Sequence, residues 1–337
     1  MELLLLALVV VVLVPTLYLS GLHDVPNAIA IPVRTRALTA RAATRLAAAC
    51  TAAGVLSALP VGLYLYTWFD FPSMSSELTL LVVLVSLLTV LGWSLHTYFQ
   101  GMPTSITHIL LSALLGATLA AAVVSGAEGQ DILGMPWMTP ILPLLVSPVA
   151  AFLVAYLLVF LAARLVRGEE AEEINRTSRM AQCVSVGLTS FGTGIQQGQR
   201  FLMVALIALT AAGVPDGDLW LGLGAVLCAG VIALGCLNGG WRIGHVLGHR
   251  LVAMDPLRGM VSTTTTAGLL VLGSLVAALP LSTSFTAASA IMGAGSNQRF
   301  ATVNWRQFRR IALYWAATPV VGVVAAAALT FGLSHLL

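Results

Sequence analysis

The sequence predicts an all-α integral membrane protein with two inverted-topology repeats of about five spans each and broken or re-entrant helices at the midplane. Three features of the chain lead to this fold class. These are its apolar composition, the positions of its arginines, and a short polar motif that occurs once in each half.

The composition excludes whole classes of protein. Of the 337 residues, 58% are hydrophobic and 9% are charged, whereas charged residues make up roughly 25% of soluble proteins. The mean hydropathy is +0.96. At about 20 apolar residues per helical span, the chain has room for roughly ten crossings of a lipid bilayer and almost no external domain. We therefore exclude a soluble enzyme, a nucleic-acid binder and a receptor with an ectodomain.

The arginines predict the topology. All 16 basic residues are arginines, and nearly all lie in four groups, at residues 34–45, 164–179, 242–258 and 299–310. Because arginine-rich loops stay in the cytoplasm, these four regions are expected there, and the acidic loops between them are expected outside. Both termini then lie outside the cytoplasm, in a multi-pass protein of the cell inner (plasma) membrane.

The apolar stretches between these markers give the spans in order. In the first half they lie near residues 3–22, 46–66, 78–100, 104–124 and 140–163, and in the second half near 182–212, 219–238, 260–279, 283–297 and 311–333. An odd number of crossings in each half means that the halves run in opposite directions. We therefore divide the chain into a first repeat at residues 1–163, a cytoplasmic linker at 164–181 and an inverted repeat at 182–337.

Both halves contain a proline followed by hydroxyl side chains. Pro103 and Pro280 each follow a long apolar stretch and precede a helix of small residues. A helix that begins there points free backbone N–H groups and the positive end of its dipole at whatever lies in front, which suits an anion. Inverted repeats of this kind are typical of secondary transporters. The candidate anion-binding side chains at these starts are Thr104, Ser105, Thr107, His108, Ser282, Thr283 and Ser284.

Two long segments carry polar residues at membrane depth. Residues 3–33 and 182–212 each exceed one straight crossing of a hydrocarbon core about 30 Å thick, and each holds glycines or a proline beside polar side chains. We expect both helices to be broken, at residues 21–27 and 192–200, because freed backbone is tolerated where it lines a cavity.

Each of these segments carries a charge, Asp24 in the first and Arg200 in the second. A charge at the centre of a span costs about 2.5–3.5 kcal/mol on insertion scales, so each needs a partner or a wet cavity. A carboxylate beside an oxyanion repels it unless a cation or proton lies between them. We therefore assign Gln196, Gln197 and Arg200 to the anion, and His23, Asp24 and Asn27 to a coupling cation. A hard cation or a proton at Asp24, with Asn27, is the candidate coupling ion; no other cofactor and no catalytic residue is expected.

Several motifs resemble the inorganic phosphate transporter (PiT) family. Gly21-Leu22-His23-Asp24-Val25-Pro26-Asn27-Ala28 is similar to that family's signature G-x-N-D-x-x-N-A, and residues 101–108 are similar to its segment G-[IL]-P-x-S-x-[ST]-H. Residues 147–148, 175–177, 239–242 and 303–306 also fit. The resemblance covers essentially the whole chain. It implies cation-coupled import of inorganic phosphate, cation and phosphate sites at the two signatures, and commonly a homodimer. With this resemblance, sodium at Asp24 and Asn27 is the candidate metal.

The chain departs from this family at four positions. His23 stands where the first signature has an asparagine, and Gln197 stands where the second has an aspartate. Thr263 replaces an expected glutamate and Phe285 an expected second histidine. Because fewer carboxylates weaken a site for a hard cation, both sodium and protons stay open as the coupling ion.

We therefore expect a secondary transporter, not an enzyme, that imports inorganic phosphate with sodium or protons. A sulfate or other oxyanion permease on the same fold is the alternative. Phosphate at neutral pH can donate hydrogen bonds whereas sulfate only accepts them, so acceptors such as Asp24 favour phosphate. An intramembrane hydrolase using Ser105, His108 and Asp24, and a sensor that binds without transporting, are further alternatives.

Overall fold

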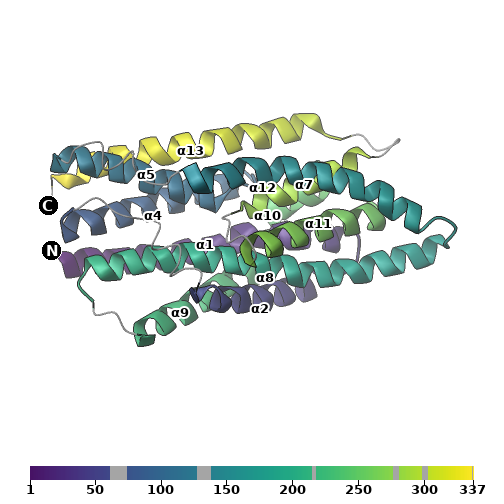
Figure 1. Ribbon diagram of the computed structural model, residues 1–337, viewed down its shortest axis with the longest axis horizontal. Helices are drawn as coiled ribbons and strands as arrows, with labels where there is room; N and C mark the ends of the chain where they lie inside the picture. The colour runs from purple at the N-terminus through teal and green to yellow at the C-terminus, as the bar shows by residue number, and fades with distance from the viewer. Residues whose placement is uncertain (61–73, 127–137, 215–217, 276–280, 298–302, 336) are drawn as a thin grey trace.

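The computed structural model describes the whole chain except residues 61–73, 127–137, 215–217, 276–280, 298–302 and 336. Long helices lie side by side in an elongated bundle, and both termini lie at the same end of it (Figure 1). The described elements are all helical: α1 (Glu2–Arg34), α2 (Ala40–Ser57), α4 (Ser76–Phe99), α5 (Ile106–Ser125), α7 (Met138–Leu165), α8 (Ala171–Ala211), α9 (Asp218–Leu237), α10 (Trp241–His245), the π-helix η1 (Val246–Arg250), α11 (Pro256–Leu275), α12 (Thr283–Ser296) and α13 (Trp305–Ser334).

Six of the described helices are long and apolar enough to cross a membrane, namely α1, α4, α5, α7, α9 and α13. Helix α8 is longer, at 41 residues, but its sequence is more polar. Helix α12 has 14 residues, which is about 21 Å at 1.5 Å per residue and shorter than a hydrocarbon core. The prediction of an all-helical membrane protein is confirmed.

Most predicted spans agree with a helix, with differences at the ends. Helix α4 begins at Ser76 and α5 at Ile106, close to the expected 78 and 104. The predicted span at 46–66 corresponds to α2, which begins earlier, at Ala40. The last residues of that predicted span, 61–66, lie outside the described part of the chain. The predicted linker 164–181 is mainly the first turns of α8. Glu172 and Glu173 stabilise that early start because acidic side chains interact favourably with a helix N-terminus.

The prediction that the two long segments are broken is wrong. Helix α1 runs without interruption through Pro26 and Pro32. Pro26 lacks the N–H that would bind the Leu22 carbonyl, and a Cβ atom at Gly240 would lie 2.1 Å from that same oxygen. The backbone of Gly240 therefore covers the freed carbonyl, and neighbouring helices are what let a proline persist inside a membrane helix.

Helix α8 is also continuous. Its glycines do not break the helix, and they allow a neighbouring helix to pack closely against it. A Cβ atom at Gly194 would lie 2.2 Å from the carbonyl oxygen of Thr51 on α2. The same close approach occurs between α1 and α9, where a Cβ atom at Gly21 would lie 2.1 Å from the carbonyl oxygen of Ile232. Small residues at such positions let membrane helices pack backbone to backbone.

The helices pair in a pattern that repeats between the halves. Helix α1 packs on α9 and α4, just as α8 packs on α2 and α11. Helix α5 packs on α13, just as α12 packs on α7. In this way α1 and α8 occupy equivalent central places, and the starts of α5 and α12 are brought toward them.

Candidate functional site

Four helices contribute polar side chains to one buried cluster. Asp24 and Asn27 come from α1, Gln197 and Arg200 come from α8, and the starts of α5 and α12 supply hydroxyl groups. Asp24 is 2% and Arg200 is 5% exposed. The structure therefore brings together the four segments to which the sequence analysis assigned the candidate side chains.

Asp24 is surrounded by hydrogen-bond donors. Its Oδ2 accepts a hydrogen bond of 2.9 Å from Gln197 Nε2, and its Oδ1 accepts one of 3.0 Å from Thr283 Oγ1. Asn27 Nδ2 lies 3.5 Å from Oδ1. Arg200 Nη2 lies 3.6 Å from Oδ2 and completes a buried ion pair. The carboxylate is thus balanced by one guanidinium group and three neutral donors.

Arg200 uses only part of its donor capacity. Its Nη1 donates a hydrogen bond to Thr107 Oγ1. Its Nε and Nη2 have no hydrogen-bond acceptor among the described residues, although both atoms are buried. A guanidinium group presents its N–H groups in a rigid planar fork that suits carboxylate or phosphate oxygens. Arg200 is therefore able to bind a further acceptor.

The two short helix starts are capped alike. Ser105 Oγ accepts the backbone N–H of His108 at the start of α5, and Ser282 Oγ accepts that of Phe285 at the start of α12, both at 3.3 Å. Serine is among the favoured N-cap residues because its oxygen satisfies one of the free N–H groups. The rings of His108 and Phe285 stack with centroids 4.6 Å apart. The two positive helix ends therefore lie side by side.

Each long helix binds the helix start that belongs to the other half. Asn27 on α1 donates a hydrogen bond of 3.0 Å to Ser284 Oγ on α12. Arg200 on α8 donates to Thr107 on α5. These two crosswise contacts link α1 to α12 and α8 to α5.

Three predicted residues lie beside this cluster and contact other groups. His23 Nε2 and Thr104 Oγ1 both lie 3.1 Å from the hydroxyl of Thr97 on α4. Gln196 Oε1 accepts the backbone N–H of Leu281 at 3.2 Å, just before α12 begins. Gln196 therefore holds the backbone just before α12, whereas His23 and Thr104 contact a side chain of α4. Among the described residues no hydrogen bond joins His23 to Asp24.

Comparison with known proteins identifies the family. The sequence model described as the Phosphate transporter family matches residues 20–326. The chain belongs to this family. Relatives named probable low-affinity inorganic phosphate transporter include proteins of Rhizobium meliloti and Bacillus subtilis. The first is 30% identical over 312 residues, covering 92% of this chain and 91% of the relative. The second is 28% identical over 305 residues, covering 89% of each.

A solved structure shares the fold of this phosphate transporter family member. It is described as the sodium-dependent phosphate transporter, and the two chains superpose with a TM-score of 0.81. Their sequences are 18% identical, and the match covers 99% of this chain and all of the other. The chain is therefore a multi-pass membrane protein of a transporter family, and not an enzyme.

The hydrolase alternative also lacks its geometry. Ser105 Oγ is occupied as the cap of α5 by the backbone N–H of His108, not by the imidazole. Asp24 is paired with Arg200 and not with His108. A nucleophilic serine needs a base within hydrogen-bond reach and a group that orients that base. The hydrogen bonds of these three side chains therefore do not form such a relay among the described residues.

Sequence reasoning missed Trp315 on α13. Its Nε1 donates a hydrogen bond of 2.8 Å to the carbonyl oxygen of Pro103, just before α5 begins. Its ring stacks on Phe285 of α12 with centroids 4.0 Å apart. Trp315 therefore positions both helix starts. In the sequence it is one aromatic residue in an apolar stretch, and no local pattern distinguishes it from a residue that faces lipid.

The site also holds oxygens that suit a hard cation. Among the described residues no cluster of three or more His, Cys, Asp or Glu side chains could hold a metal ion. However, Asn27 Oδ1 and Gln197 Oε1 are buried without a hydrogen-bond donor in the described part of the chain, and both side chains touch Asp24. Hard cations bind carboxylate, amide and carbonyl oxygens. The residues present therefore fit a sodium ion, provided that the two amides turn their oxygens toward Asp24.

Proposed function

We propose that this chain imports inorganic phosphate by symport with a cation, with sodium as the coupling ion. The relatives reported above carry the name of inorganic phosphate transporters, and the solved structure with the same fold is described as sodium-dependent. The observation that carries the proposal is the buried Arg200 guanidinium. Its Nε and Nη2 have no hydrogen-bond acceptor among the described residues, and Nη2 lies 3.6 Å from Asp24 Oδ2.

The phosphate group is bound between the two helix starts. Arg200 supplies charged N–H donors, and Thr107 and Ser284 supply hydroxyls beside the free N–H groups of α5 and α12. Helix N-termini and guanidinium groups are the groups that most often bind phosphate oxygens. Thr104, Ser105, His108, Gln196, Gln197, Ser282 and Thr283 complete the proposed substrate site as lining or positioning residues.

Coupling follows from the ion pair between Asp24 and Arg200. A phosphate ion that takes the N–H groups of Arg200 removes the counter-charge of Asp24. A buried charge without a partner is strongly destabilised, so a cation must replace the guanidinium at the carboxylate. We propose a sodium ion there, bound by Asp24, Asn27 and the Gln197 amide oxygen, with His23 supporting the same turn of α1. Anion and cation then favour each other's binding.

The two halves act as inverted repeats at residues 1–163 and 182–337, joined at 164–181. The repeated helix pairing supports this division, and so do the two crosswise contacts, Asn27 with Ser284 and Arg200 with Thr107. In such transporters one repeat moves against the other around a site at their interface. Asp24 and Gln197 occupy equivalent positions in the two signatures and bind each other at 2.9 Å.

The arginine-rich end of the bundle faces the cytoplasm in this proposal. Both termini share the opposite end (Figure 1) and lie outside the cytoplasm of the cell inner (plasma) membrane. The positive-inside rule supports this orientation. A homodimer, which the family resemblance implies, stays a prediction, and native mass spectrometry of the purified chain tests it.

Uptake of labelled phosphate into proteoliposomes tests the proposed function. We expect saturable uptake that is driven by an inward sodium gradient and resists an excess of sulfate, because Asp24 and the amide oxygens can accept hydrogen bonds from phosphate but not from sulfate. Arg200→Gln should abolish uptake, while the exposed Arg167→Gln should not. Uptake that ignores sodium and proton gradients would exclude symport. Uptake blocked by sulfate as well as by phosphate would make the chain a general oxyanion permease.

A further inference from the structure

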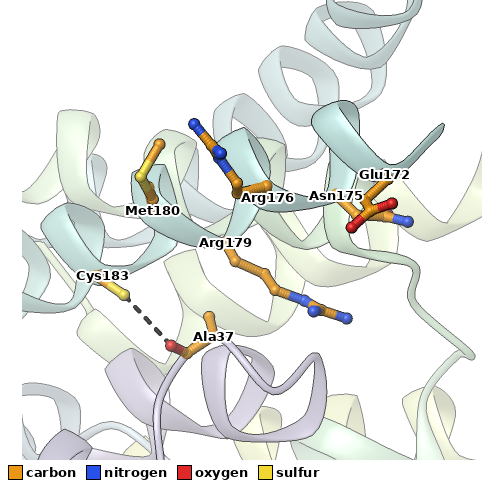
Figure 2. Close-up of a pocket in the computed structure, with 7 residues that line it drawn as sticks. All are labelled: Ala37, Glu172, Asn175, Arg176, Arg179, Met180 and Cys183. Atoms are coloured by element: carbon orange, nitrogen blue, oxygen red, sulfur yellow. Dashed lines mark hydrogen bonds between the residues drawn. The ribbon is translucent and has the colours of Figure 1, made fainter. Parts of the chain in front are cut away.

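A separate polar cavity lies at the arginine-rich end of the bundle. It has a volume of about 590 Å³ and lies between the first turns of α8 and the loop that follows α1, which contributes Ala37. The α8 side chains that line it are Glu172, Asn175, Arg176, Arg179, Met180 and Cys183 (Figure 2). They precede Gln197 and Arg200 by several turns, so this cavity is distinct from the proposed transport site.

Arg179 is a half-buried arginine of this cavity, whose lining also includes one carboxylate, that of Glu172. Its side chain extends from α8 toward the side on which Ala37 lies (Figure 2). Its Nε atom is buried and has no acceptor among the described residues, and no described carboxylate forms an ion pair with it. A buried guanidinium N–H without an acceptor is costly, which indicates that an anion completes the cavity.

The other charged lining residues do not fill that role. Arg176 points away from Arg179 (Figure 2) and its Nε lies 3.7 Å from the Glu173 carboxylate. Glu172 is exposed and lies beside Asn175 at one edge of the cavity. The anion would therefore approach Arg179 from the Ala37 side, with Asn175 as a further donor.

An apolar stripe on α8 starts at the same cavity. Met180 lines the cavity and is 54% exposed, and Val184 and Leu188 follow at 65% and 47%. Residues four apart on a helix lie on the same face. In a membrane protein such exposed apolar side chains lie against lipid acyl chains. The stripe therefore begins at one edge of the cavity, on the side of α8 where Met180 and Arg176 lie (Figure 2).

We propose that this cavity binds the phosphate-bearing headgroup of an anionic phospholipid, whose acyl chain lies along Met180, Val184 and Leu188. Guanidinium groups form strong charge-assisted hydrogen bonds with phosphate oxygens. Basic pockets at the cytoplasmic surface are attracted to the anionic lipids of that leaflet. A free phosphate ion shares the headgroup chemistry but gains nothing from the apolar stripe, and the stripe is why we choose the lipid.

Thermal unfolding of the purified full chain in a mild detergent tests this proposal. We would titrate phosphatidylglycerol, phosphatidylcholine, glycerol phosphate and inorganic phosphate, and record the midpoint temperature of unfolding. Phosphatidylglycerol should raise the midpoint well above the effect of phosphatidylcholine. Arg179→Gln should weaken the apparent affinity for phosphatidylglycerol about tenfold, the usual effect of losing a charged hydrogen bond. Arg167→Gln is the control: it removes an arginine between α7 and α8 that does not line the cavity, and it should leave that affinity unchanged.

A polar substitution on the stripe distinguishes binding of a lipid from binding of a soluble phosphate ion. Val184→Ser should reduce the effect of phosphatidylglycerol while leaving the response to glycerol phosphate unchanged. Two results together would overturn the lipid proposal and make this a site for a soluble phosphate. In the first, glycerol phosphate or inorganic phosphate raises the unfolding midpoint and Arg179→Gln removes that effect. In the second, phosphatidylglycerol raises the midpoint no more than these soluble phosphates do. Equal losses in Arg179→Gln and Arg167→Gln, or equal effects of the two lipids, would overturn it too.

Discussion

Asp24 and Arg200 are both buried, and each provides the opposite charge that offsets the cost of burying the other. The two side chains lie 3.6 Å apart on neighbouring helices with almost no exposure. Removing one partner of a buried ion pair costs about 3–5 kcal/mol because the other charge is left without compensation, whereas replacing both is often nearly neutral. This asymmetry separates the structural role of the pair from its proposed role in transport.

A double-mutant cycle on this pair should show that asymmetry. Asp24→Asn and Arg200→Gln should each destabilise the chain by about 3–5 kcal/mol, and the double variant should recover most of that loss. None of the three should transport phosphate. Thermal unfolding and proteoliposome uptake measure both properties. Additive destabilisation in the double variant would mean that the ion pair is not the coupled unit.

Gln197 is where this chain carries one carboxylate fewer than the family signature. Its Nε2 donates to Asp24 Oδ2 at 2.9 Å. Gln197→Asp would place a second negative charge near the first, and two like charges in one buried site repel each other unless a cation lies between them. We expect the variant to unfold at a lower temperature without sodium and to recover when sodium is added, with a larger recovery than Gln196→Glu gives. Equal sodium responses of the two variants would remove residue 197 from the proposed cation site.

At the scale of elements, the capped starts of α5 and α12 could be predicted from the chain and the course of α1 and α8 could not. Ser105 and Ser282 carry a local signal, a capping hydroxyl just after a proline, and both cap their helices as that signal indicates. The expected breaks at residues 21–27 and 192–200 depended on prolines and glycines whose effect is set by neighbouring helices. Gly240 covers the carbonyl freed by Pro26, and that contact is invisible in the sequence.

The close approach of α2 to α8 should be sensitive to one methyl group. A Cβ atom at Gly54 would lie 2.2 Å from the carbonyl oxygen of Phe191, so Gly54→Ala should separate the helices and cost about 1–3 kcal/mol. Gly230 on α9 has open space where a Cβ would lie. Gly230→Ala should therefore be neutral or stabilising by up to about 1 kcal/mol, the difference in helix propensity. Thermal unfolding of the two variants compares them, and equal midpoints would contradict this packing.

Trp315 should matter through the hydrogen bond that it donates to Pro103. Trp315→Phe keeps an aromatic ring against Phe285 but leaves the buried carbonyl unpaired, at a cost of about 1–3 kcal/mol. Because the start of α5 then shifts, we expect a higher KM for phosphate with a smaller change in the maximal rate. The exposed Trp305→Phe is the matched control. A variant with lower stability but an unchanged KM would show that Trp315 only supports the fold.

At the scale of the whole molecule, the arrangement couples two halves through shared contacts. Asn27 of the first half binds Ser284 of the second, and Arg200 of the second half binds Thr107 of the first. The proposed site therefore lies where the halves meet, and a relative movement of the halves changes the contacts that cross between them. This is the behaviour required of a transporter that exposes one site alternately to the two sides of the membrane.

The central claim is that phosphate and sodium bind cooperatively because both compete with the ion pair between Asp24 and Arg200. The most direct test is isothermal titration of phosphate into the purified chain at a series of sodium concentrations, and the reverse titration. We predict that sodium raises the phosphate affinity by tenfold or more, about 1.4 kcal/mol, and that phosphate raises the sodium affinity by the same factor, since binding linkage is reciprocal. A phosphate affinity that is the same with and without sodium would contradict the account.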